Sequence, residues 1–306
     1  MNQHDQTSRP HESESAHRSE PRQINAVSPL FAREDFSDER GNDFAVRSSI
    51  GAHKERNEDY GVIERITVDD VSYSIIIVCD GVSSSEQGDK ASQVACTSAL
   101  KAVLARLQST REDAKDLRAA LNAGIDAALA AVIGIPLVGE RLPWGPIKGP
   151  PATTFIASIS TATESQIAWL GDCRAYTVSS NGGVKLVTKD HSWVNMAVEA
   201  GVVTLSEAMN HKNAHMIMEC ITQDKPYTVN PSFTRVDLSN VKSLIVCSDG
   251  LWNYAHPRQD APASPLIVEL RALPKDASAK AIVDRLVDFA NEQGGHDNIT
   301  VAIQIT

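Results

Sequence analysis

The chain has 306 residues, of which 42% are hydrophobic and 22% are charged, and its formal net charge is −10. This composition excludes collagen-like and wholly disordered chains, and the length suits one large domain or two small ones. The negative charge argues against nucleic acid or an anionic membrane surface as the main partner, although bound cations can reverse the field around an active site.

The cysteines and the apolar runs favour a cytoplasmic protein. Five cysteines are present without a CxxC pair, and four of them lie in apolar stretches, which is typical of buried, reduced thiols. The N-terminal segment lacks the apolar core of a signal peptide. No run of about 18 apolar residues occurs, so we expect no membrane span.

The first 43 residues are rich in Ser, Glu, Asp, Arg, His and Gln and contain few large apolar side chains. Such a segment cannot bury enough surface to offset the entropy lost on ordering, so we predict a flexible polar tail at 1–43. A partner-binding role for it is the alternative to a plain solvated extension. Apolar patterning begins at Phe44 and continues to the end, which predicts one domain over 44–306.

Periodicity predicts the elements of this domain in chain order. Strands are expected at Tyr60–Ile66, Val71–Cys79, Thr153–Ser160, Gln166–Leu170, Ala175–Val178, Ser243–Val246 and Ile299–Ile305. Helices are expected at 86–108, at 111–133 and after Ser278, where two glycines end the last one. Segments 134–151 and 253–277 are predicted to be connections, and 190–230 follows no clear pattern. Strands around two consecutive helices indicate two packed sheets flanked by helices, because a doubly wound sheet would need regular alternation.

Four aspartates stand beside apolar strands. Asp80, Asp172 and Asp249 each follow a predicted strand, and Asp297 precedes one. Antiparallel neighbours would therefore bring all four to the same end of the sheets, close to Glu58 and Asp59. Carboxylates gathered so closely repel one another unless a cation neutralises them. Each Asp-Gly pair alone could be a simple turn, but the set of four favours a metal site.

Oxygen ligands select hard ions, so we expect Mg²⁺ or Mn²⁺ rather than Zn²⁺. Two such ions about 3.5–4 Å apart can share a water, activate it and clamp a phosphoryl group for in-line attack. No covalent intermediate is then needed. In agreement, the sequence lacks the cysteine-nucleophile phosphatase loop, GxSxG and GxxxxGK[ST].

The order of the motifs resembles one family, the type 2C, metal-dependent protein phosphatases. The motifs are RNEDYG (56–61), VCDGVSSS (78–85), ATTF (152–155), GDCRAY (171–176), TKDHSW (188–193), CSDGLW (247–252) and GGHDNITVAI (294–303). The resemblance implies an α+β fold, a four-layer α/β/β/α sandwich of two antiparallel sheets flanked by helices. It also implies two core Mn²⁺ or Mg²⁺ ions, with a third, weaker ion as in bacterial members.

The resemblance also implies roles for particular residues. Asp80 would bridge the two core ions, and the carbonyl of Gly81 would bind one of them. Asp249 and Asp297 would bind the other ion, and Glu58 would contact a metal directly or through water.

Three further residues have implied roles around these ligands. Asp172 would belong to the third metal site. Asp59 would support the ligands from behind, and Asn298 would orient Asp297 or a metal-bound water. Thr153 and Thr154 would pack the strand behind the site.

Two positions depart from the family pattern. Lys54 stands where the family has an arginine that binds the substrate phosphate. A lysine supplies a point charge without the bidentate fork, so its role is either a phosphate contact or that of a solvated surface lysine. Val82 replaces a histidine found in some members after the Asp-Gly pair.

The resemblance implies hydrolysis of phosphoserine and phosphothreonine on proteins by metal-activated water. We expect a cytoplasmic bacterial signalling enzyme whose partners are phosphoproteins, including substrates of a Ser/Thr kinase, with no nucleic acid or membrane partner. One alternative is a pseudophosphatase that binds phosphoproteins without turnover. The retained Asp80, Asp249 and Asp297 argue against it, whereas Lys54 favours it. Another alternative is a hydrolase of small phosphate esters, which uses the same metal chemistry.

Overall fold

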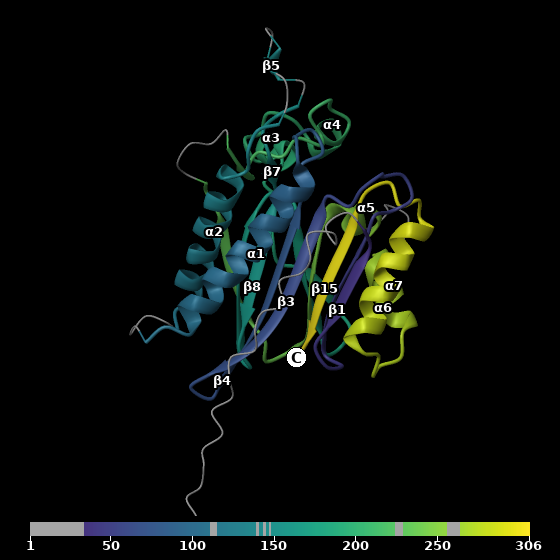
Figure 1. Ribbon diagram of the computed structural model, residues 1–306. Coiled ribbons are helices and arrows are strands. Elements are labelled where there is room, and N and C mark those ends of the chain that lie inside the picture. The colour runs from purple at the N-terminus through teal and green to yellow at the C-terminus, as the bar shows by residue number, and fades with distance from the viewer. Residues whose placement is uncertain are drawn as a thin grey trace, which may run out of the picture.

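A computed structural model describes residues 34–110, 115–138, 141–142, 145–146, 148–223, 229–255 and 264–306 of the chain. Two antiparallel sheets lie face to face, and helices cover their outer faces (Figure 1). The predicted four-layer sandwich is therefore confirmed.

The first sheet has six strands in the order β1, β2, β15, β14, β10, β11. They span Phe36–Glu39 (β1), Phe44–Ser49 (β2), Ile299–Ile305 (β15), Val241–Cys247 (β14), Arg174–Ser179 (β10) and Val184–Leu186 (β11). The second sheet has five strands in the order β13, β9, β8, β4, β3. They span Ser232–Asp237 (β13), Glu164–Leu170 (β9), Phe155–Ser160 (β8), Val71–Asp80 (β4) and Asp59–Val68 (β3). Two short pairs join Ala152–Thr153 (β7) to Ile221–Thr222 (β12), and Arg141–Leu142 (β5) to Gly145–Pro146 (β6).

Strand β4 explains why the layers stack. Side chains alternate along a strand, so Ile75 and Ile77 face the two helices at 88–107 and 117–133, whereas Ile76 and Val78 face the other sheet. All four side chains are fully buried. A strand buried on both faces must be apolar along its whole length, and this is why the segment IIIV shows no alternation.

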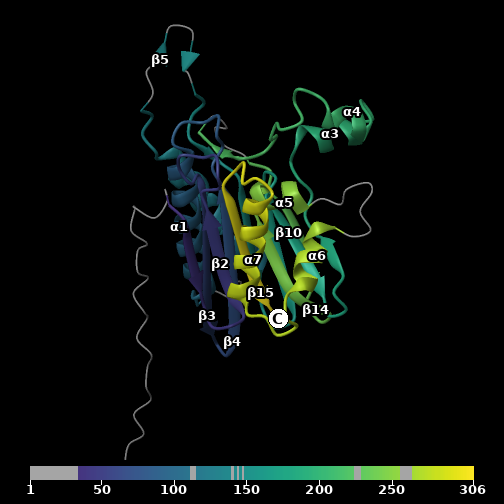
Figure 2. The ribbon, with the colours of Figure 1, turned by 90° about the vertical axis from the view of Figure 1, so that its right-hand side faces the viewer.

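The helices fall into three groups. Gly88–Leu107 (α1) and Leu117–Ile133 (α2) cover the five-stranded sheet, and Asp249–Ala255 (α5), Pro265–Ala272 (α6) and Ala279–Glu292 (α7) cover the six-stranded sheet. Trp193–Glu199 (α3) and Leu205–Met209 (α4) lie beyond one end of the sheets, opposite the end that carries the C-terminus (Figure 2). Within the described residues no helix is long and apolar enough to cross a membrane.

Several predicted boundaries were wrong. Residues 36–39 form an edge strand paired with β2, so ordered structure begins inside the predicted tail, whose residues 1–33 lie outside the described residues. Helix α2 begins at Leu117 rather than at 111, because the side chain of Asp116 caps it by accepting from the backbone of Arg118 and Ala119.

Two predicted segments also divide differently. The strand predicted at Thr153–Ser160 is interrupted at Thr154 between β7 and β8. The predicted connection 253–277 contains the end of α5 and all of α6, a helix that starts with a proline after Ser264.

Candidate metal centre

The strand ends bring the four predicted aspartates together. Asp80 ends β4, Asp172 lies in the turn between β9 and β10, Asp249 begins α5 directly after β14, and Asp297 shortly precedes β15. In the six-stranded sheet, Cys247 pairs with both Arg174 and Val301, so the neighbouring turns lie at the same level. All four aspartates line one pocket of about 520 Å³.

Burial and mutual repulsion disfavour the charged forms of these carboxyl groups. Burial first, and then the charges of neighbouring aspartates, raise the pKa of Asp172 to about 8 and that of Asp249 to about 6. The pKa of Asp80 is raised well above its ordinary value, first by burial and then by the charges of Asp59 and Asp249. The cluster therefore favours bound protons or bound cations at neutral pH.

The donor set fits a cation. Asp172 Oδ1 and Asp249 Oδ1 are buried, and among the described residues neither has a hydrogen-bond partner. Buried oxygens without donors are costly, and a hard divalent ion would satisfy them. Within the described ranges, no group of three or more His, Cys, Asp or Glu side chains is arranged so that it could hold a metal ion by itself. This arrangement suits Mg²⁺-like ions, which keep several waters and need only one or two carboxylates each.

The glycines of the two Asp-Gly pairs are required by space. A Cβ on Gly81 would lie 2.5 Å from the carbonyl oxygen of Gly88 and 2.7 Å from that of Glu58. A Cβ on Gly250 would lie 2.0 Å from the carbonyl oxygen of Asn298. Close backbone approach, rather than a left-handed turn, therefore explains both glycines.

Two threonines hold the backbone of Asp80. Its N–H donates to Thr154 Oγ1 at 3.0 Å, and its carbonyl accepts from Thr153 Oγ1 at 2.9 Å. Both threonines are fully buried. The two side chains thus fix the end of β4 that carries the proposed bridging carboxylate.

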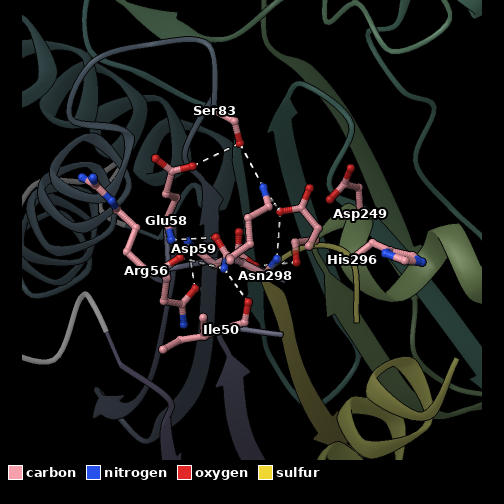
Figure 3. A network of polar contacts seen from close by, with 12 residues as sticks. Ile50, Arg56, Glu58, Asp59, Ser83, Asp249, His296 and Asn298 are labelled. Carbon is pink, nitrogen blue, oxygen red and sulfur yellow. Dashed lines mark hydrogen bonds and ion pairs between the residues drawn. The ribbon is translucent and has the colours of Figure 1, made fainter. Parts of the chain in front are cut away.

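Asn298 fastens the loop of residues 50–58. Its side-chain oxygen accepts from the N–H of Glu58 at 2.7 Å, and its Nδ2 donates to the carbonyls of Ile50 and Arg56 (Figure 3). Its backbone N–H donates to Asp297 Oδ1 at 2.8 Å. The expected contact with Asp297 is thus made by the backbone, while the side chain holds a loop that lies about 240 residues earlier in the sequence.

Lys54 and Glu58 lie on this loop and meet the loop after Gly81. Lys54 Nζ pairs with Asp297 Oδ1 at 2.5 Å and donates to Ser83 Oγ at 3.2 Å, and Ser83 Oγ donates to Glu58 Oε2 at 3.1 Å (Figure 3). Burial opposes the charge of Lys54, but the hydrogen bond and charge of Asp297 raise its pKa. Lys54 is therefore half-buried and paired with other side chains.

Asp59 is buried and lies opposite Asp80 in the β3–β4 pair. Its Oδ2 accepts from Ser248 Oγ at 2.6 Å, and Ser248 Oγ accepts in turn from the backbone of Thr300. Burial raises the pKa of Asp59 to about 7, although these hydroxyl contacts oppose the shift. This residue links β3 of one sheet to β14 and β15 of the other.

A buried ion pair on the far side of the pocket was missed by the sequence analysis. Arg174 Nη2 lies 2.6 Å from Asp190 Oδ2, and the guanidinium lies 3.6 Å from the ring centre of Trp252. Trp252 Nε1 donates to the carbonyl of Asp172 at 2.8 Å. The arginine in GDCRAY was a signal, but its partner lies sixteen residues away.

Several other pocket residues carried no sequence signal. His215 and Ile217, from the segment that follows α4, line the pocket together with Asn253 and Tyr254. His296 also lines the pocket, but it lies in the motif GGHDNITVAI, and its ring stacks on that of His53 with the ring centres 4.8 Å apart.

A two-sheet sandwich with an acidic pocket at the strand ends is the arrangement that the motifs predicted, that of a metal-dependent phosphatase. The chain matches the family model described as protein phosphatase 2C over residues 51–299, and it belongs to that family.

Curated relatives agree with this assignment. The chain is 26% identical over 260 residues to the serine/threonine protein phosphatase PstP of Mycobacterium tuberculosis. This match covers 85% of the present chain but only 44% of PstP. It is 27% identical over 261 residues to the serine/threonine phosphatase Stp of Listeria innocua, with coverage of 84% and 93%.

Solved structures share the fold. The M. tuberculosis phosphatase PstP/Ppp superposes with a TM-score of 0.61 at 25% identity, covering 86% of this chain and 97% of that one. Stp1 of Staphylococcus aureus gives a TM-score of 0.64 at 24% identity, covering 85% and 93%.

Proposed function

We propose that the chain hydrolyses phosphoserine and phosphothreonine on proteins, with residues 44–306 as the phosphatase domain and Mn²⁺ or Mg²⁺ as its cofactor. The observation that carries the proposal is the pocket lined by Asp80, Asp172, Asp249 and Asp297, two of which have buried oxygens without a donor among the described residues. A relative supports the cofactor, since PstP has been solved in complex with two manganese ions.

Asp80, Asp249 and Asp297, with the carbonyl of Gly81, would hold the core ions, and Asp172 would hold a third. When bound, such ions polarise the phosphoryl oxygens and lower the pKa of a coordinated water. The carboxylates would thus bind and orient, because charge on a transferring phosphoryl group is stabilised by positioned cations rather than by covalent chemistry.

Lys54 would contribute a positive charge on the phosphate side of the pocket. Its ammonium already lies between Asp297 and Ser83, at hydrogen-bonding distance from both. A phosphate oxygen entering there would gain a charge-assisted hydrogen bond, although not the bidentate contact of an arginine. Glu58 and Asn298 would hold the loop that carries it.

The setting is proposed to be the bacterial cytoplasm, in signalling through Ser/Thr kinases. The five cysteines form no disulfide with one another within the described residues, and four of them are buried, which suits a reducing compartment. The named relatives are bacterial phosphatases.

The test is phosphate release from a phosphothreonine peptide in the presence of Mn²⁺, with EDTA and Asp249→Asn as controls. Loss of a metal ligand is expected to lower kcat/KM about a thousandfold, equivalent to several kcal/mol of transition-state stabilisation. Circular dichroism would check that the variant is folded.

Two outcomes would contradict the proposal. Wild-type protein that binds Mn²⁺ and the phosphopeptide but releases no phosphate would indicate the pseudophosphatase, in which Lys54 serves as a fixed counter-charge to Asp297. A kcat/KM higher for p-nitrophenyl phosphate than for any phosphopeptide would indicate a hydrolase of small esters.

A further inference from the structure

We infer that Ser83 is a positioning residue that holds the Lys54 ammonium toward the substrate phosphate and couples it to Glu58. The inference rests on the proposed function and concerns Lys54, which departs from the family pattern, and the serine-rich loop 83–85. At the edge of the pocket the two are in direct contact.

The geometry makes Ser83 a bridge. Its hydroxyl accepts from Lys54 Nζ at 3.2 Å and donates to Glu58 Oε2 at 3.1 Å. A hydroxyl can do both at once, because it carries one donor and two acceptor lone pairs. An alanine or a glycine at this position could do neither.

The loop that carries Ser83 is well anchored. Val82 donates its N–H to the carbonyl of Ala152 at 3.0 Å, and Ser85 returns both its N–H and its hydroxyl to the carbonyl of Val82, at 2.8 and 2.7 Å. Ser85 is buried. The exposed Ser83 hydroxyl is thus presented from a backbone held on both sides.

A lysine needs such a partner more than an arginine does. Its ammonium is a point charge on a flexible stem, so a single contact leaves its direction open. Here the strongest attraction is to Asp297, and this contact alone would draw the ammonium onto a proposed metal ligand. The second contact, to Ser83, holds the ammonium between the acidic cluster and the mouth of the pocket.

The test compares Ser83→Ala with Ser83→Thr, which keeps the hydroxyl, and with Ser84→Ala, whose hydroxyl takes part in neither contact. Two quantities are measured on Mn²⁺-loaded protein: KM for a phosphothreonine peptide, and the Kd of inorganic phosphate by calorimetry. For Ser83→Ala we expect both to rise about three- to tenfold with kcat changed by less than about twofold, because a hydrogen bond to a charged group is lost at an exposed position. Ser83→Thr should restore both values, and Ser84→Ala should leave them unchanged.

A double-mutant comparison identifies the route of the effect. If Ser83 acts through Lys54, then Ser83→Ala should change neither KM nor the phosphate Kd in a Lys54→Met background. Additive effects of the two substitutions would overturn the inference, and so would unchanged constants in Ser83→Ala.

These failures differ from a failure of the proposed function. Wild-type protein that turns over the peptide while Ser83→Ala matches it in both constants contradicts the role of Ser83 alone. Wild-type protein that neither binds phosphate nor turns over the peptide contradicts the proposed function, and the role of Ser83 with it.

Discussion

On one side of the acidic pocket, the loop of residues 50–58 is held by the amide of Asn298, whose partners are backbone groups. On the other side, the turn that carries Asp172 is held through Trp252 by the buried pair of Arg174 and Asp190. The first fastening is neutral and local to the pocket edge, whereas the second depends on two charges that must remain together. We therefore expect substitutions that remove these two sets of contacts to lower the free energy of unfolding by different amounts.

Removing the buried ion pair should lower the free energy of unfolding the most. Arg174→Met leaves Asp190 buried without its charge partner, and this is expected to lower the free energy of unfolding by about 3–5 kcal/mol. Urea denaturation measures the change. Lys189→Met is the matched control, because Lys189 pairs with Glu199 at the surface and should contribute less than about 1 kcal/mol. Equal effects of the two variants would show that the buried pair stabilises the protein no more than a surface pair does.

Removing the hydrogen bonds of the Asn298 amide should have an intermediate effect on the free energy of unfolding. Asn298→Ala removes the acceptor of the buried Glu58 N–H, so the free energy of unfolding should fall by about 1–3 kcal/mol. Asn253→Ala serves as the control, since this amide is exposed and donates to Asp249, and the change should alter stability by less than about 0.5 kcal/mol. A loss in Asn298→Ala as large as in Arg174→Met would refute the ranking of the two sides.

The pH dependence of stability should give the smallest effect. The pKa of Asp172 is raised to about 8, so between pH 4 and pH 8 the folded protein binds more protons than the unfolded chain. Stability in EDTA should therefore fall as pH rises from 7 to 8, by on the order of 1 kcal/mol, because one pKa unit corresponds to about 1.4 kcal/mol.

Asp172→Asn should flatten this dependence, and an unchanged slope would exclude Asp172 as its source. With Mn²⁺ present the trend should reverse, because metal ligands bind in their deprotonated form. Urea unfolding at both pH values, with EDTA and with Mn²⁺, measures all three expectations.

The sequence predicted the acidic end of the sandwich because local patterns determine it. Apolar runs located β4, β9 and β14, and Asp80, Asp172 and Asp249 follow those runs directly. Antiparallel pairing then places the strand ends together whatever the connecting loops do. The same argument placed Asp297, which precedes β15.

The fastenings could not be predicted, because their partners are distant in sequence. Asn298 and Glu58 are 240 residues apart, and the short motifs around them give no sign of their contact. The contact of Lys54 with Ser83 likewise depends on how two loops meet. Helices α3, α4 and α6 were missed because each is short, with few buried side chains to create a clear period.

Gly81 and Gly250 leave no room for a Cβ, and this has a genetic consequence. Every codon that encodes another amino acid at either position introduces at least one carbon atom within 2.5 Å of a backbone oxygen. Neither position has a conservative replacement, so in a saturation library both should tolerate glycine alone. The neighbouring Ser84 should accept many residues. The strictest constraint on the gene would thus fall on two codons for glycine, the smallest amino acid.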